Sequence, residues 1–132
     1  MAAHSKNFPW MSHYNEYRFF EDRMSSHNKV LELIKLQSGL YEIVLDNGTT
    51  LKTFICECYS YGIAEYIESV ENLGSLDIIV INSNWCGYTM EAKRYCHERE
   101  VGLYDIKGLM AALNFRKYWD HLNQYERENL NT

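Results

Sequence analysis

Proline is almost absent from this chain of 132 residues, which contains only Pro9. A hydrophobic content of 46% with a single proline is typical of a packed globule and excludes a long linker or low-complexity tract. No apolar run approaches the about 18 residues of a membrane span, and the start MAAHSKNFPW lacks the apolar core of a signal peptide. The sequence therefore predicts one soluble, cytoplasmic domain, residues 1–132, that folds without disulfides or metal.

Basic residues are in the minority, with 13 Lys and Arg against 18 Asp and Glu and a net charge of -5. Binding to DNA needs clustered positive charge, so this composition disfavours a molecule that binds free DNA over its whole surface. An acidic surface complements a basic one, and the charge therefore favours a protein partner. A local basic patch that binds nucleic acid stays open, as does a homodimer through exposed aromatic residues.

The four cysteines lack the spacing of a metal site. Cys56 and Cys58 are separated by one residue and Cys96 is followed by His97, whereas zinc ligands come in CxxC or HxxxH pairs. Because no secretory context is present, reduced thiols are the expected state. The sequence accordingly predicts no cofactor, except Mg²⁺ if the enzymatic alternative below holds.

Residues 76–113 carry the clearest fold signal. A short apolar run at 76–81, rich in Ile and Val, is typical of a strand covered on both faces. A polar loop follows, then a helix with Thr89 as its N-cap, a further strand at 101–105 and another helix. This order predicts an α/β unit, within residues 61–113, whose strands are parallel. Ligands bind at the loops that follow such strands.

The N-terminal part predicts two helices and a hairpin. Residues 1–11 lack periodicity and are expected to fray. Residues 12–37 show apolar spacings of three and four, which predict one helix through Tyr14, Tyr17, Phe20 and Met24 and a second through Val30, Leu33 and Ile34. Residues 40–59 are then predicted to form two strands joined by the turn sequence Asp46-Asn47-Gly48.

The C-terminal part predicts one more helix, over residues 114–132, continuing the preceding one after a break at Asn114. Together these elements predict an α/β (α+β) fold. Its central mixed sheet has about four strands, and helices cover both faces.

The loop at residues 82–88 is the predicted binding surface. Ser83, Asn84, Trp85 and Tyr88 follow a predicted strand, and Lys93 adds positive charge on the next helix. An exposed Trp85 and Tyr88 would make an aromatic anchor for a protein partner or a stacking platform for a base. The alternative, which the sequence favours for Trp85, is that its ring packs onto the helix as core.

The segment DIIVINSNWCGYTMEAKRYCHEREVGLYDIKGLMAAL, residues 77–113, combines a strand, a Ser-containing turn, a helix, a short strand and a leucine-rich helix. It resembles the type IV, Mrr-like branch of the restriction-endonuclease-like superfamily, the PD-(D/E)XK nucleases. With the preceding hairpin and helix, the likeness covers about 75 residues. The resemblance implies a restriction-endonuclease-like core.

Catalysis in that superfamily implies an acid near one strand and an acid-x-Lys on the next, which hold Mg²⁺ so that the metal activates water. The nearest match takes Asp46 and Glu57 as acids and metal ligands, but Tyr59 occupies the lysine position. Lys52 is the substitute base, although strand alternation directs it to the other face from Glu57. Asp46 also suits the turn. Glu57, inside an apolar strand, is either a relic ligand or an edge residue facing solvent.

The resemblance therefore implies a nuclease-like domain that is catalytically degenerate. Such a pseudoenzyme would act as a small binding or regulatory protein, for instance in prokaryotic defence, counter-defence or toxin immunity. The alternative is an active Mg²⁺-dependent DNA endonuclease that uses Asp46, Glu57 and Lys52.

Residues 78–96 also resemble the strand, Cys-containing loop and helix of the thioredoxin and glutaredoxin fold. Cys86 takes the place of the first motif cysteine, near a helix N-terminus that lowers a thiol pKa, and Thr89 takes the place of the second. That fold needs a later cis-proline opposite the thiol, and Pro9 is the only proline. The third hypothesis is a monothiol redox protein that uses Cys86.

Overall fold

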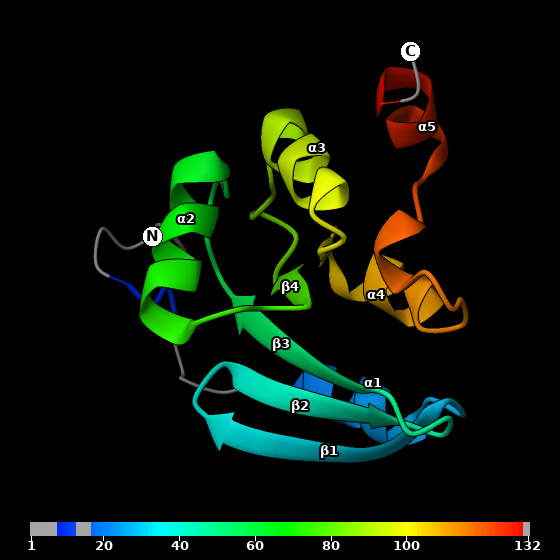
Figure 1. Cartoon of the computed structure of the whole chain (residues 1–132). Helices are drawn as coiled ribbons and strands as arrows, with labels where there is room; N and C mark the ends of the chain where they lie inside the picture. Colours follow the sequence, from blue (N-terminus) through cyan, green and yellow to red (C-terminus); the bar gives the residue numbers. More distant parts are fainter. Residues whose placement is uncertain (1–7, 13–16, 131–132) are drawn as a thin grey trace.

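The computed structural model describes residues 8–12 and 17–130. Five α-helices, five strands and one short 3-10 helix follow one another along this part of the chain (Figure 1). Their bounds are α1 Arg18–Ser26, β1 Val30–Gln37, β2 Leu40–Leu45, β3 Thr50–Cys56, α2 Ile63–Leu73, β4 Ile78–Ile81, α3 Met90–Glu98, β5 Gly102–Tyr104, α4 Ile106–Ala112, η1 Tyr118–Asp120 and α5 Gln124–Leu130. Among these residues, no helix has both the length and the apolar character to cross a membrane.

A mixed sheet of five strands, in the order β1-β2-β3-β4-β5, forms the centre of the molecule. β1, β2 and β3 are antiparallel neighbours, whereas β3, β4 and β5 run parallel. The predicted α/β class and the parallel strands of the C-terminal unit are confirmed. The sheet has one strand more than the four expected, because residues 30–37 join it.

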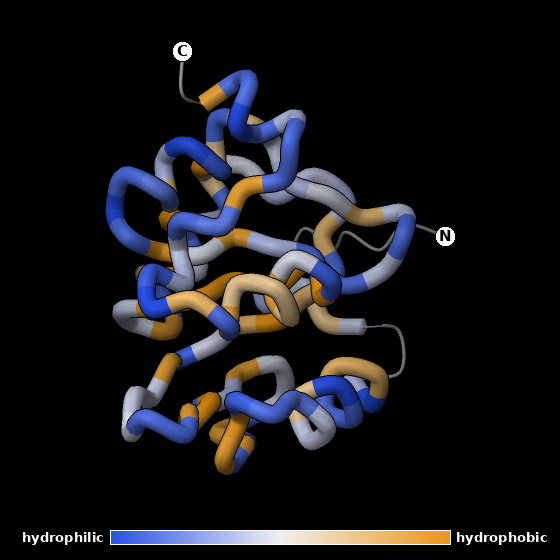
Figure 2. The backbone as a smooth tube through the Cα atoms, turned by 90° about the vertical axis from the view of Figure 1, so that its right-hand side faces the viewer, coloured by the Kyte–Doolittle hydropathy of each residue, from blue (hydrophilic) through white to orange (hydrophobic). Residues whose placement is uncertain are grey.

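Helices cover both faces of the sheet, as predicted. Phe20 and Met24 from α1 share one buried cluster with Leu109 and Ala112 from α4. Ala92 and Cys96 of α3 belong to a second cluster, against which side chains of α2 also pack. Because β4 is buried on both faces, every residue of it is apolar. Figure 2 shows hydrophobic stretches in the middle of the molecule and a mainly hydrophilic C-terminal segment.

The predicted hairpin is confirmed in β2 and β3. Gly48 has a φ of +91°, which glycine adopts without strain, and its amide donates to the Leu45 carbonyl at 3.0 Å. The Asn47 side chain accepts from the Thr49 amide at 2.9 Å. β3 ends at Cys56 rather than at residue 59, so Glu57 stands just beyond the strand.

The helix predicted through Val30, Leu33 and Ile34 is wrong, because these residues lie in β1. The pairing of β1 with β2 shifts register between Val30 and Glu32. This irregularity allows Val30 and Leu33 to pack against the same core cluster although they are three residues apart. A strand with such a shift shows the apolar spacing of a helix, which explains the error.

Residues 8–11, part of the segment predicted to fray, pack against the rest of the protein. Trp10 is buried, with its ring edge-on to that of Tyr61 at 6.0 Å between centroids. Its carbonyl accepts from the Glu57 amide at 2.8 Å. Residues 1–7 lie outside the described residues, as does Tyr14 of the predicted first helix; that helix begins at Arg18.

The single C-terminal helix predicted over residues 114–132 is also wrong. α4 ends at Ala112, near the predicted break at Asn114, and only Gln124–Leu130 is α-helical beyond it. The segment between them contains η1 and lies beside β5, where the Tyr104 hydroxyl donates to the Tyr118 carbonyl. The short helical pieces contact residues distant in sequence, η1 through Tyr104 and α5 through Lys93, which the local sequence does not reveal.

Candidate functional site

Glu57 is buried at the carboxyl end of β3, where it is 7% exposed. Its oxygen Oε2 accepts hydrogen bonds from Asn82 Nδ2 at 3.1 Å and from Ser83 Oγ at 2.8 Å. Both donors follow β4, the parallel neighbour of β3, so the two strand ends converge on this carboxylate. The two bonds offset the cost of burying it. The placement of Glu57 at a solvent-facing edge is therefore wrong.

The backbone conformation of Ser83 determines the direction of the loop after β4. Its φ of +82° lies in the left-handed region that residues other than glycine rarely adopt. The Cys86 amide donates to the Ser83 carbonyl at 3.3 Å and closes the turn. Because the Ser83 hydroxyl is bonded to Glu57, the buried carboxylate holds this conformation in place.

A second set of hydrogen bonds joins this loop to the one after β3. The Tyr61 amide donates to the Gly87 carbonyl at 2.8 Å, and the Gly87 amide donates to the Tyr59 carbonyl at 3.2 Å. Tyr61 is itself buried, with its hydroxyl 2.8 Å from Ser69 Oγ on α2. The two loops thus form one braced unit, here called the loop pair, comprising residues 57–61 and 82–88.

Two aromatic rings project from the loop pair. Trp85 is 46% exposed and Tyr59 is 65% exposed. The packing of Trp85 into the core, which the sequence favoured, is therefore wrong. Burying a large ring whose backbone is already held costs little conformational entropy, so such residues suit a binding surface.

A cavity of ≈ 530 Å³ adjoins the loop pair at the carboxyl ends of β4 and β5. This is the position at which parallel sheets bind ligands. Ser83 and Asn84 contribute to its wall, so two of the predicted binding residues do border a hollow. The lining residues are Phe19, Ile81, Asn82, Ser83, Asn84, Cys86, Asp105, Ile106 and Lys107.

Lys93, predicted as a binding residue, is instead almost fully buried, at 1% exposure. Its ammonium donates to the Leu103 carbonyl at 2.6 Å and lies 4.0 Å from the centroid of the Tyr104 ring. Burial lowers the Lys93 pKa to about 8, against the attraction of Glu126, which raises it. Lys93 therefore cannot contact a partner at the surface.

Tyr88 also turns inward, because its hydroxyl donates to Glu126 Oε2 at 2.6 Å. Glu126 is a buried residue that sequence reasoning missed, and its other carboxylate oxygen lies 3.9 Å from Lys93 Nζ. Asn123 and Glu126 also cap α5 reciprocally, since the side chain of each accepts from the backbone amide of the other. The N-x-x-E pattern of this capping box was the available signal.

Asp46 and Lys52 lie far from Glu57. Asp46 is exposed in the hairpin turn, at the opposite end of β3, whose seven residues span about 20 Å at about 3.3 Å each. Lys52 Nζ donates to the Leu73 carbonyl at 2.6 Å. The structure thus does not bring the three predicted catalytic residues together.

Across residues 8–12 and 17–130, no group of three or more His, Cys, Asp or Glu side chains could hold a metal ion. Glu57 instead meets two uncharged hydrogen-bond donors, Asn82 and Ser83.

The four cysteines are free thiols, three of them buried and Cys86 half-buried. Burial, together with the nearby charge of Glu57, raises the Cys86 pKa to about 11. This is the opposite of the lowered pKa expected for a monothiol redox site. Thr89, the other residue of that motif, accepts from the Ala92 amide at 3.0 Å and caps α3, as predicted from the sequence.

No protein-family model matches this chain, and no curated protein or solved structure is significantly similar to it. The restriction-endonuclease-like resemblance therefore stays a prediction, and the function has to be argued from the site.

Proposed function

We propose that this protein is a binding module that engages a protein partner through the loop pair, with Trp85 and Tyr59 as anchors. The exposure of these two rings on a braced backbone is the observation that carries the proposal. Trp and Tyr are enriched among the residues that dominate binding energy, and a pre-formed surface retains more of that energy. The net charge of -5 favours a partner with a basic surface.

We further propose that the scaffold is a nuclease-like core without catalytic function. Three observations support this: Tyr59 stands where the superfamily has lysine, Asp46 lies at the far end of β3, and Glu57 bonds to neutral donors. In this proposal Glu57 supports the loop pair instead of a metal ion. Roles in prokaryotic defence, counter-defence or toxin immunity are the pathways that the resemblance suggests.

Affinity capture with matched variants tests the proposal. Full-length protein, Trp85→Ala and Tyr125→Ala are immobilised and exposed to lysate of the source cells, and each captured protein is then purified and titrated. Tyr125 is the control, because it is 62% exposed but lies on α5. A true partner loses at least about tenfold in affinity with Trp85→Ala, as an anchor residue does, and is unaffected by Tyr125→Ala. Equal binding by wild type and Trp85→Ala would refute the proposal.

A further inference from the structure

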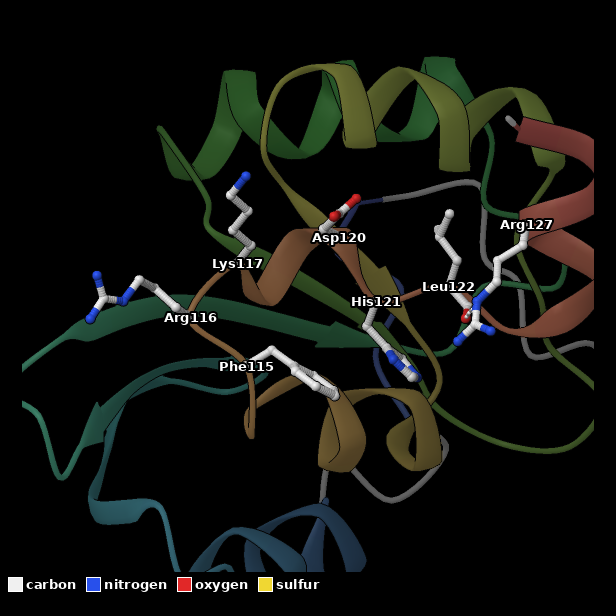
Figure 3. Close-up of a pocket in the computed structure, with 7 residues that line it drawn as sticks. All are labelled: Phe115, Arg116, Lys117, Asp120, His121, Leu122 and Arg127. Carbon is white, nitrogen blue, oxygen red and sulfur yellow. Dashed lines mark hydrogen bonds between the residues drawn. The ribbon is translucent and has the colours of Figure 1, made fainter. Parts of the chain in front are cut away.

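A second hollow lies away from the loop pair, in the segment that joins α4 to α5. It is a cavity of ≈ 570 Å³, within the size range of small-molecule sites. Figure 3 shows its side chains arriving from the loop after α4, from η1 and its C-terminal end, and from α5. The lining residues are Phe115, Arg116, Lys117, Asp120, His121, Leu122 and Arg127.

Positive charge gathers here although the protein as a whole is acidic. Arg116, Lys117 and Arg127 line the cavity with Asp120 as the one acid. Among the described residues, the side chains of Arg116 and Lys117 have no hydrogen bond or ion pair, and Arg127 uses only Nε, on the Leu122 carbonyl at 3.1 Å. Free guanidinium and ammonium groups around a hollow suit a phosphate.

Asp120 offsets only part of this positive charge, and one of its carboxylate oxygens is engaged with another residue. Its Oδ1 lies 2.6 Å from Nε2 of His97, a residue of α3 outside the cavity lining. That oxygen is thereby held toward α3, and three cations against one acid leave the cavity with a net positive charge for a ligand.

An aromatic surface completes the cavity. The Phe115 ring is 56% exposed and lies nearly parallel to that of His121, with 5.9 Å between centroids and 12° between planes. Burial lowers the His121 pKa, the charges of Lys93 and Arg127 act in the same direction, and the charge of Glu126 opposes them, so the uncharged ring is favoured. In Figure 3 the two rings lie against each other, with Arg127 beyond His121 and Lys117 and Arg116 on the other side.

We propose that this cavity binds a free nucleoside phosphate, with the base stacked on the exposed face of Phe115 and the phosphate held by the surrounding cations. Inorganic phosphate would use the cations but not the ring, and an aromatic peptide would use the ring but not the cations. A nucleoside phosphate uses both features, because its base stacks on the aromatic ring and its phosphate forms charge-assisted hydrogen bonds with the cations. A long nucleic acid fits less well, because the acidic remainder of the surface repels it. The inference is independent of the proposed partner at the loop pair.

Titration calorimetry at low salt tests the proposed nucleotide site. The probes are AMP and ATP, and the comparison ligands are adenosine, inorganic phosphate and a ten-residue oligothymidine. We expect both nucleotides to bind more tightly than adenosine or phosphate. Phe115→Ala should weaken AMP binding at least about fivefold, as should Arg127→Gln. Asp120→Asn should strengthen it, since the variant removes the one acid. Tyr125→Ala is the matched control, because Tyr125 is also an exposed ring, at 62%, but lies outside the cavity lining, and it should change nothing.

Several results would overturn the inference. Absence of nucleotide binding would do so, as would binding that Phe115→Ala and Arg127→Gln leave intact while circular dichroism shows both variants folded. Phosphate binding equal to that of AMP would remove the stacking role. Tighter binding of the oligonucleotide than of ATP would reassign the cavity from free nucleotides to nucleic acid.

Discussion

Lys93 on α3 and Glu126 on α5 face each other in the interior, with 3.9 Å between the ammonium nitrogen and a carboxylate oxygen. Both residues are buried, and the Tyr88 hydroxyl and the Asn123 amide donate the other hydrogen bonds to the carboxylate. A buried ion pair adds little net stability when complete, but losing one partner leaves the other charge uncompensated. The pair therefore makes the docking of the last helix sensitive to single substitutions.

Glu126→Gln should lower the free energy of unfolding by about 2–3 kcal/mol, because it leaves the Lys93 charge without its counter-charge. Urea unfolding at pH 7 measures this. Glu128→Gln is the control on the same helix; Glu128 is exposed, and its loss should cost less than about 0.5 kcal/mol. Equal losses from the two variants would show that the buried pair has no special role.

Lys93→Met should change the pH dependence of stability. The Lys93 pKa falls to about 8 in the folded protein from 10.5, so the folded state binds fewer protons between these values. Stability from this group is therefore lost as pH falls through about 8 and is regained as pH rises toward 10.5. Relative to Lys93→Met, wild type should gain up to about 3 kcal/mol between pH 7 and pH 10, measured by urea unfolding. Parallel curves for the two proteins would contradict the shift.

Glu57→Ala should destabilise the fold by about 2 kcal/mol and loosen the loop pair, because Asn82 and Ser83 lose their acceptor. Glu57→Gln keeps a carbonyl oxygen in place and should recover at least half of that loss. The hydrogen-exchange rates of the Gly87 and Thr89 amides measure directly how often the loop pair opens. If exchange there is unchanged in Glu57→Ala, the carboxylate does not brace the loop.

Titration with Mg²⁺ and Mn²⁺ should give no binding that depends on Glu57, since Asp46 lies in the hairpin turn and Lys52 near the start of β3. The measurement is calorimetry on wild type beside Glu57→Ala, with plasmid cleavage assayed in parallel. Micromolar binding lost in the variant, together with cleavage by wild type, would instead establish the endonuclease alternative.

Cys86 should react slowly with iodoacetamide at pH 8. Its pKa is raised to about 11 from 9.0, which lowers the thiolate fraction by about 100-fold relative to an unperturbed thiol. The rate of alkylation in buffer, compared with that in urea, measures the effect, and Cys86→Ser identifies the reacting site. A faster rate in the folded protein would revive the redox hypothesis.

The local signals in the sequence predicted the hairpin, the parallel C-terminal unit and the Thr89 cap, because each depends on residues close together in the chain. β1 was mistaken for a helix because its register shift produces helical spacing, and only its pairing with β2 distinguishes the two. Burial of Trp10 likewise depends on Tyr61, which is distant in sequence.

The site was predicted in part. Ser83, Asn84 and Trp85 do follow the carboxyl end of β4, as the order of elements indicated, whereas Glu57, expected inside a strand, lies just beyond the end of β3. Lys93 was misplaced because its partner, Glu126, comes from a segment whose contacts the sequence does not show. No local sequence pattern indicated that the residues around Phe115 line a cavity either. The cavity walls come from η1, α5 and the loop after α4, which only the folded chain brings together.

The irregular pairing of β1 also bears on how the molecule behaves at high concentration. β1 forms one edge of the sheet and exposes Leu31 and Leu36, features that invite a strand from another chain. Register shifts near both ends distort that edge, and the exposed charges of Glu32 and Lys35 lie between them. The same irregularity that disguises the strand in the sequence thus protects the folded protein from edge-to-edge aggregation.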